Sequence, residues 1–102
     1  MIKCVVNKEK EIINEINISG HAEYADSGED IVCAGASMLS YAIANKCLKL
    51  NSEFKFIEDV EKGMNFKNDG TNKEINLLLE TLVEGLEMLM DEYPKNIELR
   101  RK

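Results

Sequence analysis

The residues of the chain best suited to chemistry are His21, its only histidine, and Cys33, twelve residues further on. A cysteine thiolate is a strong nucleophile, and an imidazole can accept and return a proton near neutral pH. If Asp30 caps the helix predicted after it, Cys33 is at the third helical position, where amide N–H groups and the helix dipole favour an anionic sulfur. The same amides are expected to form an oxyanion hole. This pair therefore predicts nucleophilic attack on a carbonyl group.

A line of polar residues runs along one face of this predicted helix, which is otherwise apolar. Ser37, one turn after Cys33, is a candidate to bind a substrate carbonyl or a water, and Asp30 is a candidate to orient His21. A structural interpretation stays open, because a helical serine often bonds back to the carbonyl one turn earlier and an aspartate can be no more than a cap. The members of the line, at i, i+3, i+7 and i+10, are Asp30, Cys33, Ser37 and Ser40.

A second start for the helix is also open, because the sequence SGED at residues 27–30 matches a capping box that would begin it earlier. Cys33 would then lie beyond the first turn, where the N-terminal amides no longer reach it. The position of the N-cap therefore decides whether the helix can activate this thiol.

The other two cysteines, Cys4 and Cys47, are expected to fill the hydrophobic core, since cysteine is among the most buried residue types. A redox pair with Cys33 would have to use Cys4, because Cys47 is ~21 Å away along the same predicted helix. The three cysteines form no C-x-x-C pair and the chain has one histidine, so the ligand spacing of a metal site is lacking. We expect reduced thiols, no metal and no cofactor.

The composition is that of one globular domain over residues 1–102, with 44% hydrophobic and 31% charged residues. The formal net charge of -6 disfavours direct binding to nucleic acid, whereas it does not disfavour a basic protein partner. The longest largely apolar stretch, residues 31–44, is shorter than a bilayer span, and no signal-peptide pattern precedes it. We expect a cytoplasmic protein with no membrane partner.

The spacing of apolar residues predicts seven elements in the order β-β-α-β-β-α-β. In the second strand, Ile12, Ile16 and Ile18 are expected to share one face. Pro94 is expected to end the second helix. The expected ranges are 2–7 and 12–18 for a first hairpin, 31–50 for a buried helix, 53–58 and 63–68 for a second hairpin, 73–92 for a helix opened by Gly70 and Thr71, and 96–101 for a final strand.

Two helices of this length are enough to cover one side of about five strands. The chain is therefore expected to be an α+β two-layer sandwich with a mixed or antiparallel sheet. The second helix has more apolar residues than one buried face requires, because Leu77, Met88 and Met90 lie off its main stripe. A second copy of the chain is expected to cover these residues or the other face of the sheet, so we expect a homodimer.

Residues 20–37 resemble the signature of a known family. Gly20-His21, a gap, and then DIVCAGAS at residues 30–37 are similar to the G-H…D-I-V-C-A-A-x-S pattern of the bacterial ribosomal-processing cysteine proteases, the Prp family. Chain length, element order and the single domain are also similar, so the resemblance extends over essentially the whole chain. Gly35 departs from the pattern, which more often has alanine there.

The resemblance implies a cytoplasmic, homodimeric cysteine endopeptidase that removes a short N-terminal extension from a large-subunit ribosomal protein during ribosome maturation. By matching of positions, Cys33 is the nucleophile and His21 is the general base and acid. Asp30 and Ser37 are the other polar residues of the site, and Gly20 lets the following loop turn. A substrate that orders this loop is expected to bring the imidazole to the sulfur.

Acidic segments fit a basic substrate such as a ribosomal protein. Residues 21–30 include four acids and no lysine or arginine, and residues 73–92 include six acids and one lysine. The alternative function is a non-catalytic dimeric protein-binding module associated with ribosome assembly, in which Cys33 has the reactivity of an ordinary thiol.

Overall fold

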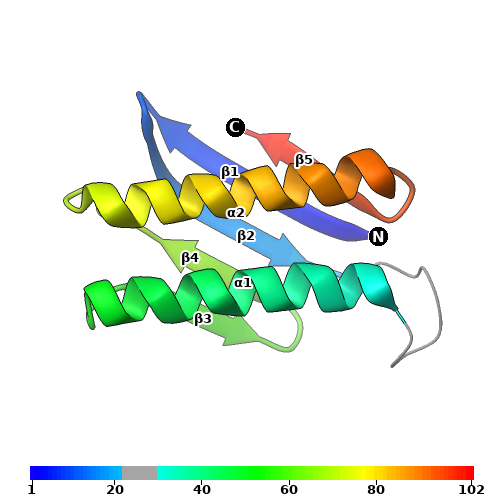
Figure 1. Ribbon diagram of the computed structural model, residues 1–102, viewed down its shortest axis with the longest axis horizontal. Coiled ribbons are helices and arrows are strands. Elements are labelled where there is room, and N and C mark those ends of the chain that lie inside the picture. Colours follow the sequence, from blue (N-terminus) through cyan, green and yellow to red (C-terminus); the bar gives the residue numbers. More distant parts are fainter. Residues whose placement is uncertain (22–29) are drawn as a thin grey trace.

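Seven elements follow one another in the order β-β-α-β-β-α-β in the computed structural model (Figure 1), which describes residues 1–21 and 30–102. This order confirms the predicted fold class. The five strands form one mixed sheet in the order β3-β4-β2-β1-β5, in which β1 and β5 are parallel and the other neighbours antiparallel. The elements are β1 (Ile2–Glu9), β2 (Ile12–Ser19), α1 (Ile31–Leu50), β3 (Lys55–Asp59), β4 (Gly63–Lys67), α2 (Lys73–Glu92) and β5 (Ile97–Arg101).

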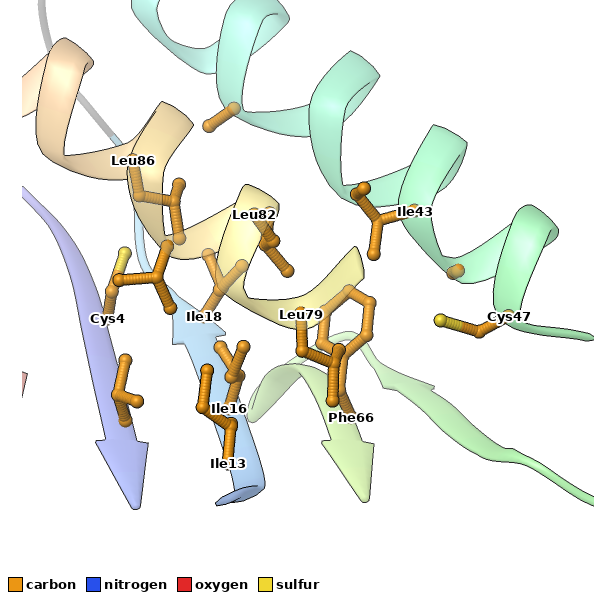
Figure 2. Packing of buried hydrophobic residues seen from close by; sticks show 14 of the residues in the cluster. Cys4, Ile13, Ile16, Ile18, Ile43, Cys47, Phe66, Leu79, Leu82 and Leu86 are labelled. Atoms are coloured by element: carbon orange, nitrogen blue, oxygen red, sulfur yellow. The ribbon is translucent and has the colours of Figure 1, made fainter. Parts of the chain in front are cut away.

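The two helices run antiparallel, side by side, on one face of the sheet, as Figure 1 shows. The hydrophobic core fills the space between these two layers (Figure 2). Burying one such side chain contributes roughly 1.5–3 kcal/mol, so the core fixes both helices against the strands. Its buried side chains include Cys4, Ile16, Ile18 and Phe66 from the sheet and Ile43, Cys47, Leu79, Leu82 and Leu86 from the helices.

α2 spans Lys73–Glu92, the expected range, but the residue that opens it is not Gly70 or Thr71. Its N-cap is Asn72, whose side chain accepts hydrogen bonds from the backbone N–H groups of Glu74 and Ile75. An asparagine cap satisfies two amides that have no partner inside the helix. The helix therefore begins at Lys73, and it ends at Glu92, before Pro94 as predicted.

A β-bulge in β2 corrects the expected inward face of this strand. Asn7 pairs with Glu15 and Lys8 pairs with Ile13, so Asn14 has no partner residue on β1. An extra residue reverses the alternation of side chains on either side of it. Ile13 is therefore buried beside Ile16 and Ile18, whereas Ile12 is 38% exposed.

By length and composition α1 could cross a membrane, which differs from the expectation drawn from residues 31–44 alone. In the structure, one face of this helix packs in the core of the domain, while Met38 on another face is 73% exposed. α1 is thus a core helix of the folded domain. The residues of its buried face are Val32, Ala36, Ser40, Ile43, Ala44 and Cys47.

Of the three apolar residues of α2 that lie off its main stripe, two are on the surface. Leu77 and Met88 are mostly exposed, whereas Met90 is partly buried and packs against the core. Because burial of exposed apolar surface is favourable, these two residues are available for a contact with another molecule.

α1 and α2 approach each other through two glycines, each of which faces a leucine of the opposite helix. Leu89 lies over Gly35, and Leu39 lies over Gly85. A Cβ atom added at Gly35 would be 3.5 Å from Leu89 Cδ2, an ordinary van der Waals distance, whereas a Cβ atom at Gly85 would overlap Leu39. Gly35 therefore leaves room for a methyl group, and Gly85 does not.

Gly35→Ala is expected to raise the free energy of unfolding by about 0.5–1 kcal/mol, because alanine favours a helix and its methyl group fits. Gly85→Ala is the matched control. There Leu39 must change its rotamer or shift, so this variant should be less stable than Gly35→Ala by about 1 kcal/mol or more. Urea unfolding of both variants measures the difference, and equal stabilisation by both would be inconsistent with this helix packing.

Candidate active site

Cys33 lies in the first turn of α1, which begins at Ile31 with Asp30 as its N-cap. The Asp30 carboxylate accepts hydrogen bonds from the backbone N–H groups of Val32, at 3.0 Å, and Cys33, at 2.9 Å. Cys33 is therefore the third residue of the helix, as predicted. The earlier start is excluded by this cap, and Ser27, with which the capping box would begin, lies outside the described residues.

Three amides of this turn are hydrogen-bonded to Asp30. Besides the two bonds to its side chain, the N–H of Ala34 donates to the Asp30 carbonyl oxygen at 3.0 Å. An oxyanion hole needs donors that point at the reacting oxygen of the substrate. Asp30 therefore acts on these amides as a cap that stabilises the helix, and the expected oxyanion hole at this turn stays a prediction.

Cys33 and His21 line the same pocket, whose volume is about 240 Å³. Cys33 is partly buried, and His21, which follows the end of β2, is exposed. The sulfur is thus neither sealed in the core nor fully in solvent, so a ligand in the pocket can meet it. Of the predicted site residues, the pocket brings together Gly20, His21, Cys33 and Ser37, while Asp30 caps the helix.

Gly20 carries the chain from β2 to His21 with a backbone that other residues rarely adopt. Its φ of 87° is in the left-handed region, and a Cβ atom there would overlap the carbonyl oxygen of Met1. Only glycine has no Cβ, so both restrictions select it. The backbone at Gly20 therefore has the expected turning conformation.

Ser40, the last residue of the polar line, has a structural role. Its side chain is fully buried, and its Oγ donates to the carbonyl oxygen of Ala36, one turn earlier, at 2.7 Å. This is the back-bonding alternative, which satisfies a hydroxyl inside the core. The last member of the polar line that lines the pocket is therefore Ser37, which is partly buried.

The thiols of Cys4 and Cys47 are fully buried, which confirms them as core residues. Burial raises the pKa of the Cys4 thiol to about 12, and the nearby Glu98 carboxylate adds to this effect. Burial also raises the pKa of Cys47 to about 11. Both thiols are therefore neutral near pH 7, and neutral thiols are poor nucleophiles.

Iodoacetamide at pH 8 is expected to alkylate Cys33 at least about 100-fold faster than Cys4 or Cys47, because only a thiolate reacts and the two buried thiols ionise only as the pH rises towards their pKa values. Mass spectrometry of proteolytic fragments measures the three rates. In guanidinium chloride, where burial is lost, the three rates should become comparable. Equal labelling of the folded protein at all three sites would rule out this difference in environment.

Part of the pocket lining comes from the β3–β4 hairpin, which sequence reasoning did not connect with the site. Val60 and Glu61, in the turn between β3 and β4, and Met64, in β4, line it together with Cys33. They reach the pocket because β4 pairs with β2, with Met64 opposite Ile18. No local pattern marks these residues, so only the pairing of the strands could have found them.

The arrangement supports nucleophilic chemistry, because a thiol and an imidazole lie on the wall of one open pocket. Within residues 1–21 and 30–102, no three His, Cys, Asp or Glu side chains are grouped to hold a metal ion. The pocket wall offers a thiol, an imidazole and the neighbouring hydroxyl of Ser37.

Comparison with known proteins gives a consistent result over the whole chain. The family model described as cysteine protease Prp matches residues 1–98. The chain is 35% identical over 104 residues to the ribosomal processing cysteine protease Prp of Staphylococcus aureus (strain NCTC 8325 / PS 47), covering 99% of this chain and 97% of the relative. It is 24% identical over 108 residues to the protein of that name from Bacillus subtilis (strain 168), covering 97% and 96%.

Solved structures show the same likeness in three dimensions. The crystal structure of the essential ribosomal processing protease Prp from S. aureus, in complex with a covalently linked product peptide, matches with a TM-score of 0.92 at 30% identity, over 100% of both chains. The structure of that protease with a substrate peptide matches with a TM-score of 0.85 at 30% identity, again over 100% of both chains.

Proposed function

The chain belongs to the Prp family of cysteine proteases, and we propose that it removes a short N-terminal extension from a large-subunit ribosomal protein during ribosome maturation. The observation that carries this proposal is the pocket whose wall includes both Cys33 and His21. Further support comes from the S. aureus relative, which has been crystallised with a substrate peptide and with a covalently linked product peptide.

The proposed reaction begins with Cys33 as the nucleophile. His21 takes the proton of the thiol, and Sγ attacks the carbonyl carbon of the scissile bond. The C–N bond then breaks, the amine of the mature protein leaves with the proton from His21, and the extension stays on the enzyme as a thioester. A water, deprotonated by the same imidazole, hydrolyses the thioester and restores the thiol.

Ser37 and Asp30 are proposed to support this reaction in different ways. Ser37 is one helical turn from Cys33 and lines the pocket, so its hydroxyl can donate to the substrate carbonyl or hold a water there. Asp30 holds the first turn of α1, and therefore the position of the sulfur, through its bonds to Val32 and Cys33. The substrate would thus meet a nucleophile whose backbone is fixed before binding.

Charge and surface features support the remaining parts of the proposal. With a net charge of -6, the protein attracts a basic ribosomal protein more than it attracts nucleic acid. We also propose a cytoplasmic homodimer, in which a second copy covers the exposed Leu77 and Met88 of α2. Sedimentation of the purified protein tests the dimer, for which Leu77→Gln with Met88→Gln is the variant expected to dissociate.

The test of the proposed function is cleavage of the extended ribosomal protein from the same organism, and of a peptide that spans the junction. Mass spectrometry of the products is expected to show one cut, at the boundary between extension and mature protein. A folded, purified enzyme that leaves both substrates intact would oppose the proposal. Cleavage at many unrelated sites would oppose its specificity.

A further inference from the structure

The turn between β3 and β4 supplies part of the wall of the pocket that contains Cys33. Val60 and Glu61 line the pocket from this turn, and Gly63 and Met64 continue the wall into β4. The turn is remote from Cys33 in the sequence but joins the same cavity through the pairing of β2 with β4. A substrate held at the sulfur would therefore also meet this turn.

The backbone of the turn is fixed before any substrate binds. The Asp59 side chain accepts hydrogen bonds from the backbone N–H groups of Glu61, at 2.8 Å, and Lys62, at 3.0 Å. These bonds, that from Lys62 first, lower the pKa of the Asp59 carboxyl, which keeps it charged as an acceptor. At Gly63, φ is 84° and an added Cβ atom would overlap the carbonyl oxygen of Ile18, so the end of the turn is fixed against β2.

The side chains that this fixed turn presents are one apolar and one acidic. Val60 is fully exposed, and Glu61 is exposed at the edge of the pocket. Among the described residues that line this pocket, Glu61 is the one acidic side chain, and none is a lysine or an arginine. The wall therefore offers a peptide an apolar contact next to a single negative charge.

We propose that Glu61 is a specificity-determining residue, which selects peptides with a lysine or arginine close to the scissile bond. The inference rests on the proposed function and assigns part of its substrate specificity to the β3–β4 turn. A carboxylate on a pre-ordered turn attracts a cationic side chain without a cost for ordering the backbone. Val60 packs against the aliphatic part of the same side chain, since lysine and arginine have long apolar stems.

The experiment compares cleavage of junction peptides by wild-type enzyme, Glu61→Gln and Glu61→Lys. Each peptide carries lysine, glutamine or glutamate at one position, from three residues before to three after the scissile bond. At one position, wild type should have a higher kcat/KM for the lysine peptide than for the glutamine peptide. Glu61→Gln should reduce this ratio about threefold. Glu61→Lys should shift the ratio of kcat/KM between the lysine and glutamate peptides about tenfold towards glutamate. High salt should weaken these preferences.

Glu11→Gln is the matched control, because it removes the same charge from an exposed glutamate in the turn between β1 and β2, at the other end of β2. This control should keep the wild-type preference at every position. Position preferences that are identical in wild type, Glu61→Gln and Glu61→Lys would overturn the inference while leaving the proposed cleavage intact. Absence of cleavage of every peptide by the folded wild-type enzyme would instead oppose the proposed function itself.

Discussion

Cys33→Ala is expected to lower kcat for cleavage of the extended precursor by about 10⁴- to 10⁶-fold, because alanine cannot form the thioester. The side chain is partly buried in the pocket wall, so removing its sulfur should leave the helix and its Asp30 cap in place. The fold of the variant is checked by circular dichroism and by its unfolding transition. Its cleavage rate is measured with the junction peptide under single-turnover conditions.

Cys4→Ala and Cys47→Ala are the controls for this prediction. Both residues are fully buried away from the pocket lining, so these variants should lose stability but retain cleavage when folded. If purified, folded Cys33→Ala cleaved the precursor at the wild-type rate, the covalent mechanism on Cys33 would be contradicted. Loss of cleavage in all three folded variants would contradict the prediction that Cys33 is the one cysteine of the three needed for cleavage.

His21→Ala is expected to lower the rate of thioester formation by about 10²- to 10⁴-fold, which is the range of general acid–base catalysis. Binding of the peptide should change by less than about threefold, since the imidazole acts on the proton of the thiol and is not a main contact. Single-turnover kinetics at several peptide concentrations separate the two quantities. The partly buried Cys33 thiol stays in place, so any loss reports on the base.

Added imidazole is the matched test of this role. His21 is exposed at the pocket, so a small base from solution can reach the position that alanine leaves vacant. Imidazole should therefore restore part of the rate in His21→Ala and should not restore Cys33→Ala. Unchanged single-turnover kinetics in His21→Ala would assign the base to another residue.

The fold could be predicted from the sequence because its signals are local. The spacing of apolar residues in the two hairpins, the apolar stripe of α2 and the stop at Pro94 each depend on neighbouring residues, and the structure confirms the elements that they predict. The N-cap at Asp30 is also a local signal, so the sequence could predict that Cys33 is the third residue of the helix.

The features that sequence reasoning missed depend on contacts between distant segments. The bulge at Asn14 follows from the pairing of β1 with β2, and it decides that Ile13 rather than Ile12 faces the core. Val60 and Glu61 join the pocket only through the pairing of β2 with β4. Strand register of this kind is set by the whole sheet and leaves no pattern within either segment.

The expected oxyanion hole stays a prediction, because it depends on how the helix start meets a substrate. The sequence placed the correct residue at the cap, but the cap uses the very amides that the oxyanion hole would need. Ser37, the other donor that the sequence indicated, lies in the pocket wall.

The most direct measurement of the role of Cys33 is the location of the covalent intermediate. Enzyme and junction peptide are mixed, quenched with acid within the first turnover, and analysed by intact mass and then by fragment mass spectrometry. The predicted result is an adduct with the mass of the N-terminal extension less one water, located on Cys33 and absent from Cys33→Ala. An adduct on another residue, or a burst of released mature peptide with Cys33 unmodified, would contradict covalent catalysis by this thiol.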